Sequence, residues 1–325
     1  MILAGDIGAT NSRLALLDEN LSVVAQDVYK SQEYQSFNDI VRQFLDTYNY
    51  PITTACFGLP GPIREGKCKL TNVPWEVVDA TVLSEVTNSP VALLNDVESN
   101  AYGLETLRDD ELVTLNEGSK IAGGNRAVVA VGTSVGEAIL VEVAGNIHAL
   151  GTEGGHADFG PFDELQWELI RYTQKQYKRV SYEVILGGQG LVQIYDFLRD
   201  SGLGESPKSL LEEMETGDKA ALINKAAQEG SCQISVKAME MFISILAAEC
   251  GNAAVKYFST GGIYIGGGMA PKILNSLRDP SFVENFVNKD KMREFLTDIP
   301  VYVILNEDTS LQGAAWYAKR LISRH

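Results

Sequence analysis

Two turns that combine glycine with hydroxyl or amide side chains contain the residue types that bind phosphate. The first lies near the N-terminus, in "GDIGATN", and comprises Gly5, Asp6, Gly8, Ala9, Thr10 and Asn11. Glycine lets a backbone approach a ligand closely, and a turn with free N–H groups can hold an anion. The side chains of Thr10 and Asn11 add donors. The stretch therefore predicts a β-hairpin that cups a phosphate, and an ordinary glycine hairpin is the equally good alternative.

The second turn, "GTSVG", contains Gly132, Thr133 and Gly136 between two apolar segments. A third glycine loop, in "IYIGGGMAP", contains Gly266, Gly267 and Gly268, and the helix that follows would also favour an anion at its N-terminus. A tight strand-to-helix turn explains this third loop equally well. The motif GxxxxGK[ST] is absent, and so is GxGxxG after the first strand, which disfavours a P-loop ATPase and a Rossmann dehydrogenase.

A second group of candidates consists of polar side chains that could contact a substrate. Asn95 and Asp96 end the apolar run "VALLND", at the carboxyl end of a predicted strand, where α/β proteins tend to place their sites. Glu153 and His156 lie in the glycine-rich stretch "GTEGGHADFGP", and Glu183 begins an apolar helix. Each also has a structural explanation: a helix N-cap for Asp96, a first-turn carboxylate for Glu183, and a hydrogen-bonded loop side chain for His156.

The elements that would position these residues alternate between strand and helix, so the predicted class is α/β. Residues 2–17 and 128–143 share one pattern of apolar strand, turn and apolar strand, which is a weak internal duplication. Residues 164–257 read as mostly helical, and the chain closes with the strand "VYVILN" and the helix "LQGAAWYAKRLISR". We therefore predict two domains that face a shared cleft: residues 1–106 with 312–325, and residues 107–311.

Composition restricts the partners of the protein. The chain has 325 residues, 45% of them hydrophobic, and a net charge of −16, so neither nucleic acid nor an anionic membrane surface is an expected partner. No stretch reaches the ~18 apolar residues of a spanning helix, and no export signal precedes the first strand, which predicts a cytoplasmic protein. The four cysteines are then expected to be free thiols rather than two disulfides, and three histidines make a structural zinc site unlikely.

Taken together, the motifs resemble those of bacterial-type glucokinases, and the resemblance covers nearly the whole chain. The motifs found in the order of that family are "GDIGATN", "LTNVPW", "LLND", "GTSVG", "GTEGGHADFGP", "SYEVILGGQGL", "IYIGGGMAP" and "LQGAA". The family belongs to the hexokinase–actin–Hsp70 class, so the resemblance implies a two-domain actin-like (ribonuclease H-like) ATPase fold. It also implies ATP and Mg²⁺ as cofactors, phosphorylation of glucose at O6, and a place in glycolysis.

The resemblance assigns a role to each candidate by its position. Asp96 falls on the catalytic base, and the sugar-binding positions are Asn95, Asp96, Glu153, His156 and Glu183. The phosphate hairpins and the loop near the adenosine are Gly5, Asp6, Gly8, Ala9, Thr10, Asn11, Gly132, Thr133, Gly136, Gly266, Gly267 and Gly268. Asp6 is further expected to organise Mg²⁺, directly or through water.

The chain departs from the family pattern at a few positions. Ala9 and Ser134 replace glycines in the two turns, which puts nucleotide affinity and donor preference in doubt, and Val97 replaces a common Phe. No Cys-rich zinc motif follows His156, which favours the plain branch over the ROK kinases.

Glucose and ATP are the expected partners, in a homodimer. Two alternatives stay open: a kinase for another hexose or another donor, such as polyphosphate or ADP, and a non-catalytic sugar sensor. The presence of Asp96 and the lack of a DNA-binding segment before the first strand argue against the sensor.

Overall fold

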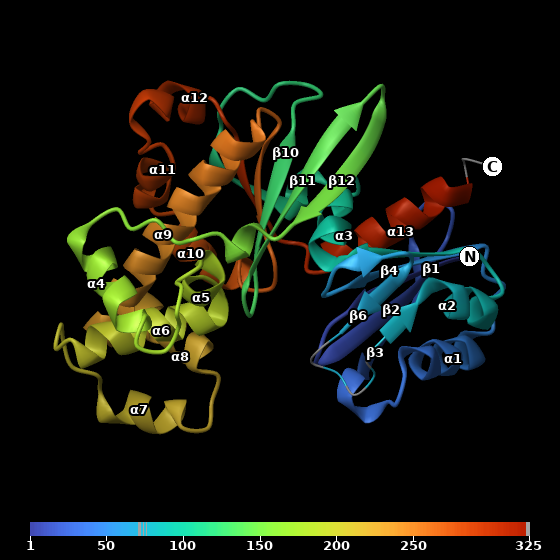
Figure 1. Cartoon of the computed structure of the whole chain (residues 1–325), viewed down its shortest axis with the longest axis horizontal. Helices are drawn as coiled ribbons and strands as arrows, with labels where there is room; N and C mark the ends of the chain where they lie inside the picture. The colour runs from blue at the N-terminus through green and yellow to red at the C-terminus, as the bar shows by residue number, and fades with distance from the viewer. Residues whose placement is uncertain (71–72, 74, 76, 323–325) are drawn as a thin grey trace. The chain divides into compact units, whose positions relative to one another are not determined.

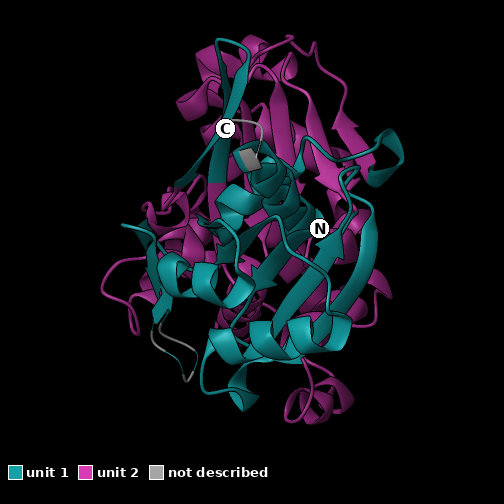
Figure 2. Ribbon diagram, turned by 90° about the vertical axis from the view of Figure 1, so that its right-hand side faces the viewer, with its two compact units in different colours: residues 1–111, 138–151, 306–325 teal, residues 112–137, 152–305 magenta. Residues whose placement is uncertain are grey.

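The computed structural model describes residues 1–70, 73, 75 and 77–322. Thr71, Asn72 and Pro74 of the motif "LTNVPW" lie outside the described residues. The chain divides into two compact units, coloured separately in Figure 2. Unit 1 comprises Met1–Glu111, Ala138–Gly151 and Asn306–His325, and unit 2 comprises Leu112–Glu137 and Thr152–Leu305. The domain limits near residues 107 and 312 stay a prediction.

Unit 1 is built on a five-stranded sheet in the order β3-β2-β1-β4-β8. Its strands are β1 (Ile2–Ile7), β2 (Asn11–Leu17), β3 (Val23–Lys30), β4 (Thr54–Leu59) and β8 (Val91–Asn95). The first three strands are antiparallel, whereas β4 and β8 continue from β1 in parallel. A three-stranded sheet of β5 (Ile63–Arg64), β6 (Lys67–Lys69) and β7 (Val77–Asp79) completes the unit. The parallel strands bring the ends of β1, β4 and β8 to one edge of the sheet.

Helices cover both faces of this sheet, which explains why all six residues of β4 are buried. Figure 1 shows α1 (Phe37–Tyr48) and α2 (Ala80–Thr87) on one face, with α3 (Asp96–Gly103) and α13 (Thr309–Ile322) on the other. The first helix forms because apolar residues recur at helical spacing, because Ser36 caps the N–H of Asp39, and because Asn49 ends it in the left-handed conformation. Gly313 lets α13 approach α3 closely, since a Cβ there would lie 1.8 Å from the Ser99 carbonyl oxygen.

Unit 2 is built on a sheet in the order β12-β11-β10-β13-β14-β9. Its strands are β9 (Leu112–Asn116), β10 (Arg126–Val131), β11 (Val135–Val143), β12 (Asn146–Thr152), β13 (Gly262–Gly266) and β14 (Val301–Ile304). The strands β10, β13 and β14 are parallel, and β9 is antiparallel to β14. Residues 138–151 of the β11–β12 hairpin are counted with unit 1.

The region from residue 164 to 257 is mostly helical, as predicted. It contains α4 (Glu164–Thr173), α5 (Tyr182–Ile185), α6 (Gly187–Asp200), α7 (Lys208–Met214), α8 (Lys219–Gln228) and α9 (Gln233–Tyr257). Three short helices follow: α10 (Leu274–Leu277), α11 (Pro280–Phe286) and α12 (Arg293–Thr297). All four cysteines of the chain are buried free thiols, which confirms that prediction.

The helix α9 forms the core of unit 2 and contacts β10, β13, α6, α8 and α11. Within the described residues it is the one helix whose length and composition would allow it to cross a membrane, although the sequence was expected to contain no stretch of this kind. However, 72% of its most apolar window is buried inside the protein. The apolar residues of α9 are therefore accounted for by packing.

Candidate functional site

The first candidate turn connects β1 to β2, and three of its carbonyl groups accept hydrogen bonds from one neighbouring segment. The Gly8 carbonyl accepts from Ser31 Oγ at 2.7 Å, that of Ala9 from Gln32 Nε2 at 3.1 Å, and that of Thr10 from the Ser31 N–H at 3.0 Å. Ser31 and Gln32 belong to a 3₁₀ turn that directly follows β3. The Gly8 N–H donates to the Asn11 carbonyl at 2.9 Å, which leaves the N–H groups of Ala9 and Thr10 for an anion. This is the arrangement that an anion site requires.

Gly5 and Asp6 lie before this turn, inside β1. A Cβ on Gly5 would lie 2.6 Å from Phe57 and 2.7 Å from Leu14, so core packing by itself requires a glycine here. The predicted contact between Gly5 and a nucleotide stays a prediction. Asp6 is different, because its Oδ1 accepts from Ser310 Oγ at 3.0 Å.

The carboxyl group of Asp6 lies in an environment that disfavours its negative charge. Burial raises the pKa of Asp6. The hydrogen bond from Ser310 and the charge of Arg13 act in the opposite direction, and the charge of Asp308 raises the pKa further. Arg13 does not compensate fully, because its Nη1 forms an ion pair with Asp308 Oδ1 at 2.7 Å. A cation beside Asp6 would restore its ionised form, so this carboxyl group fits a Mg²⁺ site.

Asn95 and Asp96 lie where β8 ends and α3 begins. Asn95 is the N-cap: its Oδ1 accepts from the Val97 N–H at 3.0 Å, and its Nδ2 donates to the Gly61 carbonyl at 3.2 Å. Asp96 is the first residue of α3, and its Oδ1 also accepts from the Val97 N–H, at 2.8 Å. Ser310 Oγ lies 3.5 Å from the Asp96 carbonyl oxygen. The Ser310 hydroxyl thus contacts both Asp6 and the backbone of Asp96 within unit 1.

In unit 2, the second candidate turn connects β10 to β11 and lies against the start of α6. The Gly132 N–H donates to the Ser134 carbonyl at 2.9 Å, and the Gly132 carbonyl accepts from the Gly188 N–H at 2.9 Å. Gly187 has a φ of 84°, and a Cβ there would lie 2.7 Å from the backbone of Thr133 and of Ser134. Gly187, the first glycine of "LGGQG", is therefore required for α6 to begin directly against this turn.

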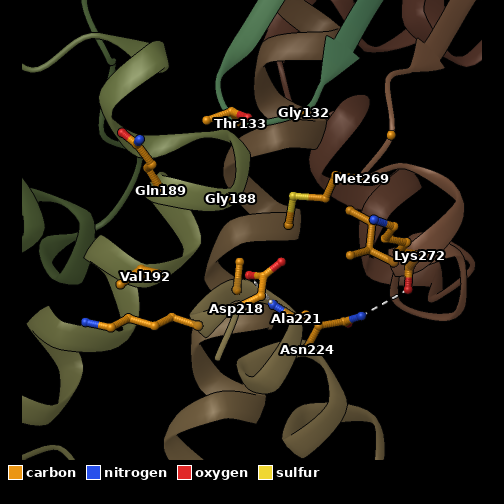
Figure 3. Close-up of a pocket in the computed structure, with 14 residues that line it drawn as sticks. Gly132, Thr133, Gly188, Gln189, Val192, Asp218, Ala221, Asn224, Met269 and Lys272 are labelled. Carbon is orange, nitrogen blue, oxygen red and sulfur yellow. Dashed lines mark hydrogen bonds between the residues drawn. The ribbon is translucent and has the colours of Figure 1, made fainter. Parts of the chain in front are cut away.

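A cavity of about 810 Å³ opens beside this turn, within the size range of small-molecule sites. Figure 3 shows its walls: the turn, the start of α6, the start of α8 and the loop after β13. Its lining combines apolar and polar side chains, among them Val192, Met269, Gln189, Asp218, Asn224 and Lys272. Asn224 Nδ2 donates to the Lys272 carbonyl at 3.0 Å, which connects α8 to the loop. An apolar surface with a few polar groups suits a nucleoside.

The glycines around this cavity fall into two kinds. A Cβ on Gly132 or Gly268 would meet no atom within 4 Å, so their small size leaves room for a ligand rather than for the protein. Gly267 has a φ of 84°, and a Cβ on it would lie 2.4 Å from the Val131 carbonyl oxygen, so the fold itself requires it. Gly266 is the buried end of β13, and Gly136 is a half-buried residue of β11. Of these predicted glycines, Gly132 and Gly268 line the cavity, as does Gly188 at the start of α6.

Glu153, His156 and Glu183 are brought together in unit 2, although Glu183 lies 27 residues along the chain from His156. His156 Nδ1 lies 2.8 Å from Glu183 Oε2, and His156 Nε2 lies 3.7 Å from Glu153 Oε2. A bridge between Asp158 and Ser181, with the Tyr182 N–H donating to the Ala157 carbonyl, holds the two segments side by side. All three side chains are at least 37% exposed, so they can accept and donate hydrogen bonds to a polar ligand.

The sequence did not single out several residues that belong to these sites. Ser310 contacts Asp6, and its place just before "LQGAA" was the available signal. Asp218 and Asn224 line the cavity from α8, where Asp218 is also the helix N-cap. Since they lie in a long helical region, nothing in their spacing distinguished them from surface residues.

The geometry agrees with what comparisons with known proteins find. A model of the glucokinase family matches residues 3–321. The chain is 36% identical over 340 residues to the glucokinase of a Nostoc species, and the alignment covers 99% of each protein. A crystal structure of a glucokinase from an Antarctic psychrotroph covers 98% of each chain, with a TM-score of 0.83 and 27% identity. The ROK family glucokinase of Streptomyces griseus covers 98% of this chain and 99% of its own, and shares the fold at a TM-score of 0.68 and 16% identity.

These similarities confirm the actin-like ATPase fold and the closer relationship to the plain branch than to the ROK kinases. Because the family match extends over nearly its whole length, the chain belongs to the glucokinase family.

Proposed function

We propose that this chain transfers the γ-phosphoryl group of ATP to O6 of D-glucose, giving glucose 6-phosphate and ADP. The observation that carries the proposal is the full-length match to the glucokinase family. Phosphoryl transfer requires alignment of the two substrates, neutralisation of phosphate charge and an acceptor for the hydroxyl proton. The two units contain side chains suited to each of these tasks.

For the nucleotide, unit 1 offers the hairpin between β1 and β2, and unit 2 offers the turn between β10 and β11 with the cavity beside it. The cavity would accept the adenosine, with Gly132 and Gly268 leaving room for close approach. The N–H groups of Ala9 and Thr10 would donate to phosphate oxygens, since the Gly8 N–H already donates to the Asn11 carbonyl inside the turn. Asp6 would hold Mg²⁺, whose chemistry is to neutralise phosphate charge, and the raised pKa of Asp6 supports this assignment.

For the sugar, unit 1 offers hydrogen-bonding side chains at the end of β8, and unit 2 offers a cluster of three. Glu153, His156 and Glu183 would bind the ring hydroxyls, for which carboxylates provide acceptors and His156 provides a donor and an acceptor. The Nδ2 group of Asn95 has a second hydrogen, beyond the one given to Gly61, for a further hydroxyl. A hexose with one inverted hydroxyl would leave one of these groups unpaired, which favours one epimer.

Asp96 would be the general base. As the bond between O6 and the γ-phosphorus forms and the bond from that phosphorus to ADP breaks, the Asp96 carboxylate accepts the O6 proton and later releases it to solvent. The hydrogen bond from the Val97 N–H to Asp96 Oδ1 would fix the carboxylate for this transfer.

A coupled assay of the purified chain tests the proposal. ADP formation is measured with glucose, mannose, galactose and fructose, and with ATP, ADP or polyphosphate as donor. We expect the highest kcat/KM with glucose and ATP, in the presence of Mg²⁺. Binding of glucose without any turnover would instead identify a sugar sensor, and a preference for another hexose or donor would contradict the substrate assignment.

The setting of the enzyme is part of the proposal. The net charge of −16 and the four buried free thiols support a cytoplasmic location, where thiols stay reduced. We also propose that the chain forms a homodimer. Light scattering of the purified protein tests this, and a monomer mass at assay concentration would contradict it.

A further inference from the structure

A pair of buried carboxyl groups in unit 2 has no part in the proposed chemistry. Glu137 of β11 and Glu249 of α9 are both fully buried. Tyr257 donates its hydroxyl to Glu137 Oε2 at 3.0 Å. Lys256 Nζ lies 2.9 Å from Glu249 Oε1, and Asn252 Nδ2 donates to Glu249 Oε2 at 2.8 Å. Lys256 is thus the ammonium group that forms an ion pair with Glu249.

The pattern of hydrogen bonds indicates that the pair shares a proton. Among the described residues, no donor reaches Glu137 Oε1, although this atom is buried. A proton on Glu137, donated to Glu249, would satisfy it and would remove one of the two negative charges. Burial, with Glu249 adding to it, raises the pKa of Glu137 to about 7. Near neutral pH Glu137 thus changes between its protonated and its ionised form.

Other titratable groups face the pair from α5, α9 and the segment after α11. They are Tyr182, Cys250, Lys256, Tyr257 and Lys289. Burial raises the pKa of Tyr182 and of Cys250, so both stay neutral when Glu137 titrates. Burial also lowers the pKa of Lys289, which Glu249 opposes. Glu137 is therefore the group whose charge changes near neutral pH.

Glu137 lies directly beneath the loop that carries Glu153 and His156. A Cβ on Gly154, between those two residues, would overlap the Glu137 carboxyl group. The Thr152 hydroxyl donates to the Glu137 carbonyl at 3.0 Å and accepts from the Gly154 N–H at 3.1 Å. The position of this loop is therefore tied to both the side chain and the backbone of Glu137.

Glu249 has a corresponding connection to the segment that carries Glu183. Asn252 Nδ2, which donates to Glu249, also donates to the Tyr182 hydroxyl at 2.9 Å. Tyr182 directly precedes Glu183 and stacks edge-on against Phe159 of the loop, with ring centroids 5.7 Å apart. The carboxyl pair thus supports both sides of the contact between His156 and Glu183.

We propose that Glu137 is a positioning residue for the hexose site: sharing its proton with Glu249, it holds the Glu153–His156 loop and the Tyr182–Glu183 segment in register. This inference rests on the proposed function, since it assumes that these residues bind the sugar. Loss of the proton places two anions in contact in the interior, and the loop that packs on Glu137 moves in response. The affinity for glucose then falls as the pH rises through neutrality, whereas the nucleotide cavity, which Glu137 does not line, keeps its affinity.

The test compares glucose and ATP kinetics of the wild type and Glu137→Gln at about pH 6 and about pH 8.5, either side of the Glu137 titration. For the wild type we expect the glucose KM to rise at least about threefold at the higher pH, with the ATP KM nearly unchanged. The amide of Glu137→Gln donates a hydrogen bond without titrating, so this variant should keep a low glucose KM at both values. Glu137→Ala should raise the glucose KM at both.

Ser235→Ala is the matched control. Ser235 lies on α9 and, like Glu137, is fully buried and has a side-chain oxygen without a hydrogen-bond partner among the described residues. It should retain the pH dependence of the wild type. A pH-dependent glucose KM in Glu137→Gln that equals that of the wild type would overturn the inference, and this outcome is readable even if Glu137→Ala does not fold. If the wild type does not phosphorylate glucose, the proposed function itself fails. If it does, and the Glu137 variants leave the glucose KM unaltered, the inference alone is refuted.

Discussion

Replacing Glu183 by Gln tests whether the contact between His156 and Glu183 belongs to a hexose site. His156 Nδ1 lies 2.8 Å from Glu183 Oε2, and the substitution keeps the shape of the side chain while it removes the charge and exchanges one acceptor for a donor. If Glu183 binds a sugar hydroxyl, glucose loses a charge-assisted hydrogen bond. The orientation of His156 also becomes less defined, because its partner is then neutral.

The size of the effect follows from the difference between two kinds of hydrogen bond. A bond to a charged group contributes about 1.5–3 kcal/mol and one between neutral groups about 0.5–1.5 kcal/mol. The two ranges differ by about 1–1.5 kcal/mol. Solvent screens the Glu183 side chain, which is 37% exposed, so the lower end applies, about 1 kcal/mol. The glucose KM should rise about fivefold, and the ATP KM should stay nearly constant.

The assay measures both KM values and the melting temperature, with Glu164→Gln as the control. Glu164 also lies in the first turn of a helix of unit 2, but it pairs with Arg171 at the surface, away from His156. Both substitutions remove a charge near a helix N-terminus and should cost about 0.3–1 kcal/mol of stability. An unchanged glucose KM in Glu183→Gln, with a loss of stability equal to that of the control, would refute the reasoning and leave Glu183 as a structural carboxylate.

Three further outcomes are expected. Asp96→Asn should lower kcat by about 10²–10⁴-fold while calorimetry still detects glucose binding, and near-normal kcat would exclude the base. Gly268→Ala should raise the ATP KM at an unchanged melting temperature, whereas Gly267→Ala should lower the melting temperature because its Cβ would clash with Val131. Equal effects of the two substitutions would contradict the distinction between a glycine that leaves room for a ligand and one that the fold requires. Since burial raises the pKa of Glu137 from 4.5 to about 7, its stabilisation is complete below about pH 4.5 and is lost as the pH rises through about 7. In urea unfolding, the free energy of unfolding of the wild type should fall between about pH 5 and about pH 8, by up to about 3 kcal/mol, and that of Glu137→Gln should not show this fall. An equal fall in the variant would contradict the assignment.

The local patterns of the chain predicted the elements that carry the site better than they predicted their partners. The hairpin between β1 and β2 follows from two apolar runs around a short turn, and the structure has it there. That Ser31 and Gln32 engage the carbonyls of the turn could not be predicted, because they lie about 20 residues further on, after another strand. Gly5 is an example of the opposite kind. It lies in a motif typical of phosphate binding, but packing against Phe57 and Leu14 in β1 is enough to require a glycine there.

The contact between His156 and Glu183 depends on a pairing that no periodicity encodes. An isolated bridge between Asp158 and Ser181 brings the segments together, and a single bridge leaves no alternating pattern of apolar residues to detect. The carboxyl pair was hidden for a similar reason. Glu137 lies in the apolar run after "GTSVG", where it reads as an exposed residue of a strand. Only the folded structure shows that it is buried and that Tyr257 of α9 donates to it.

The two positions where the turns lack the usual glycine can be examined in terms of backbone conformation. Alanine or serine in a left-handed conformation would strain a turn, and the effect would spread to the N–H groups that bind phosphate. In the described part of the chain, the non-glycine residues with positive φ do not include Ala9 or Ser134. The Ala9 carbonyl is held by Gln32, and that of Ser134 accepts from the Gly132 N–H, so both turns keep their hydrogen bonds. Any change in donor preference must therefore come from the added side-chain atoms meeting the nucleotide, which Ala9→Gly and Ser134→Gly would reverse without altering the turns.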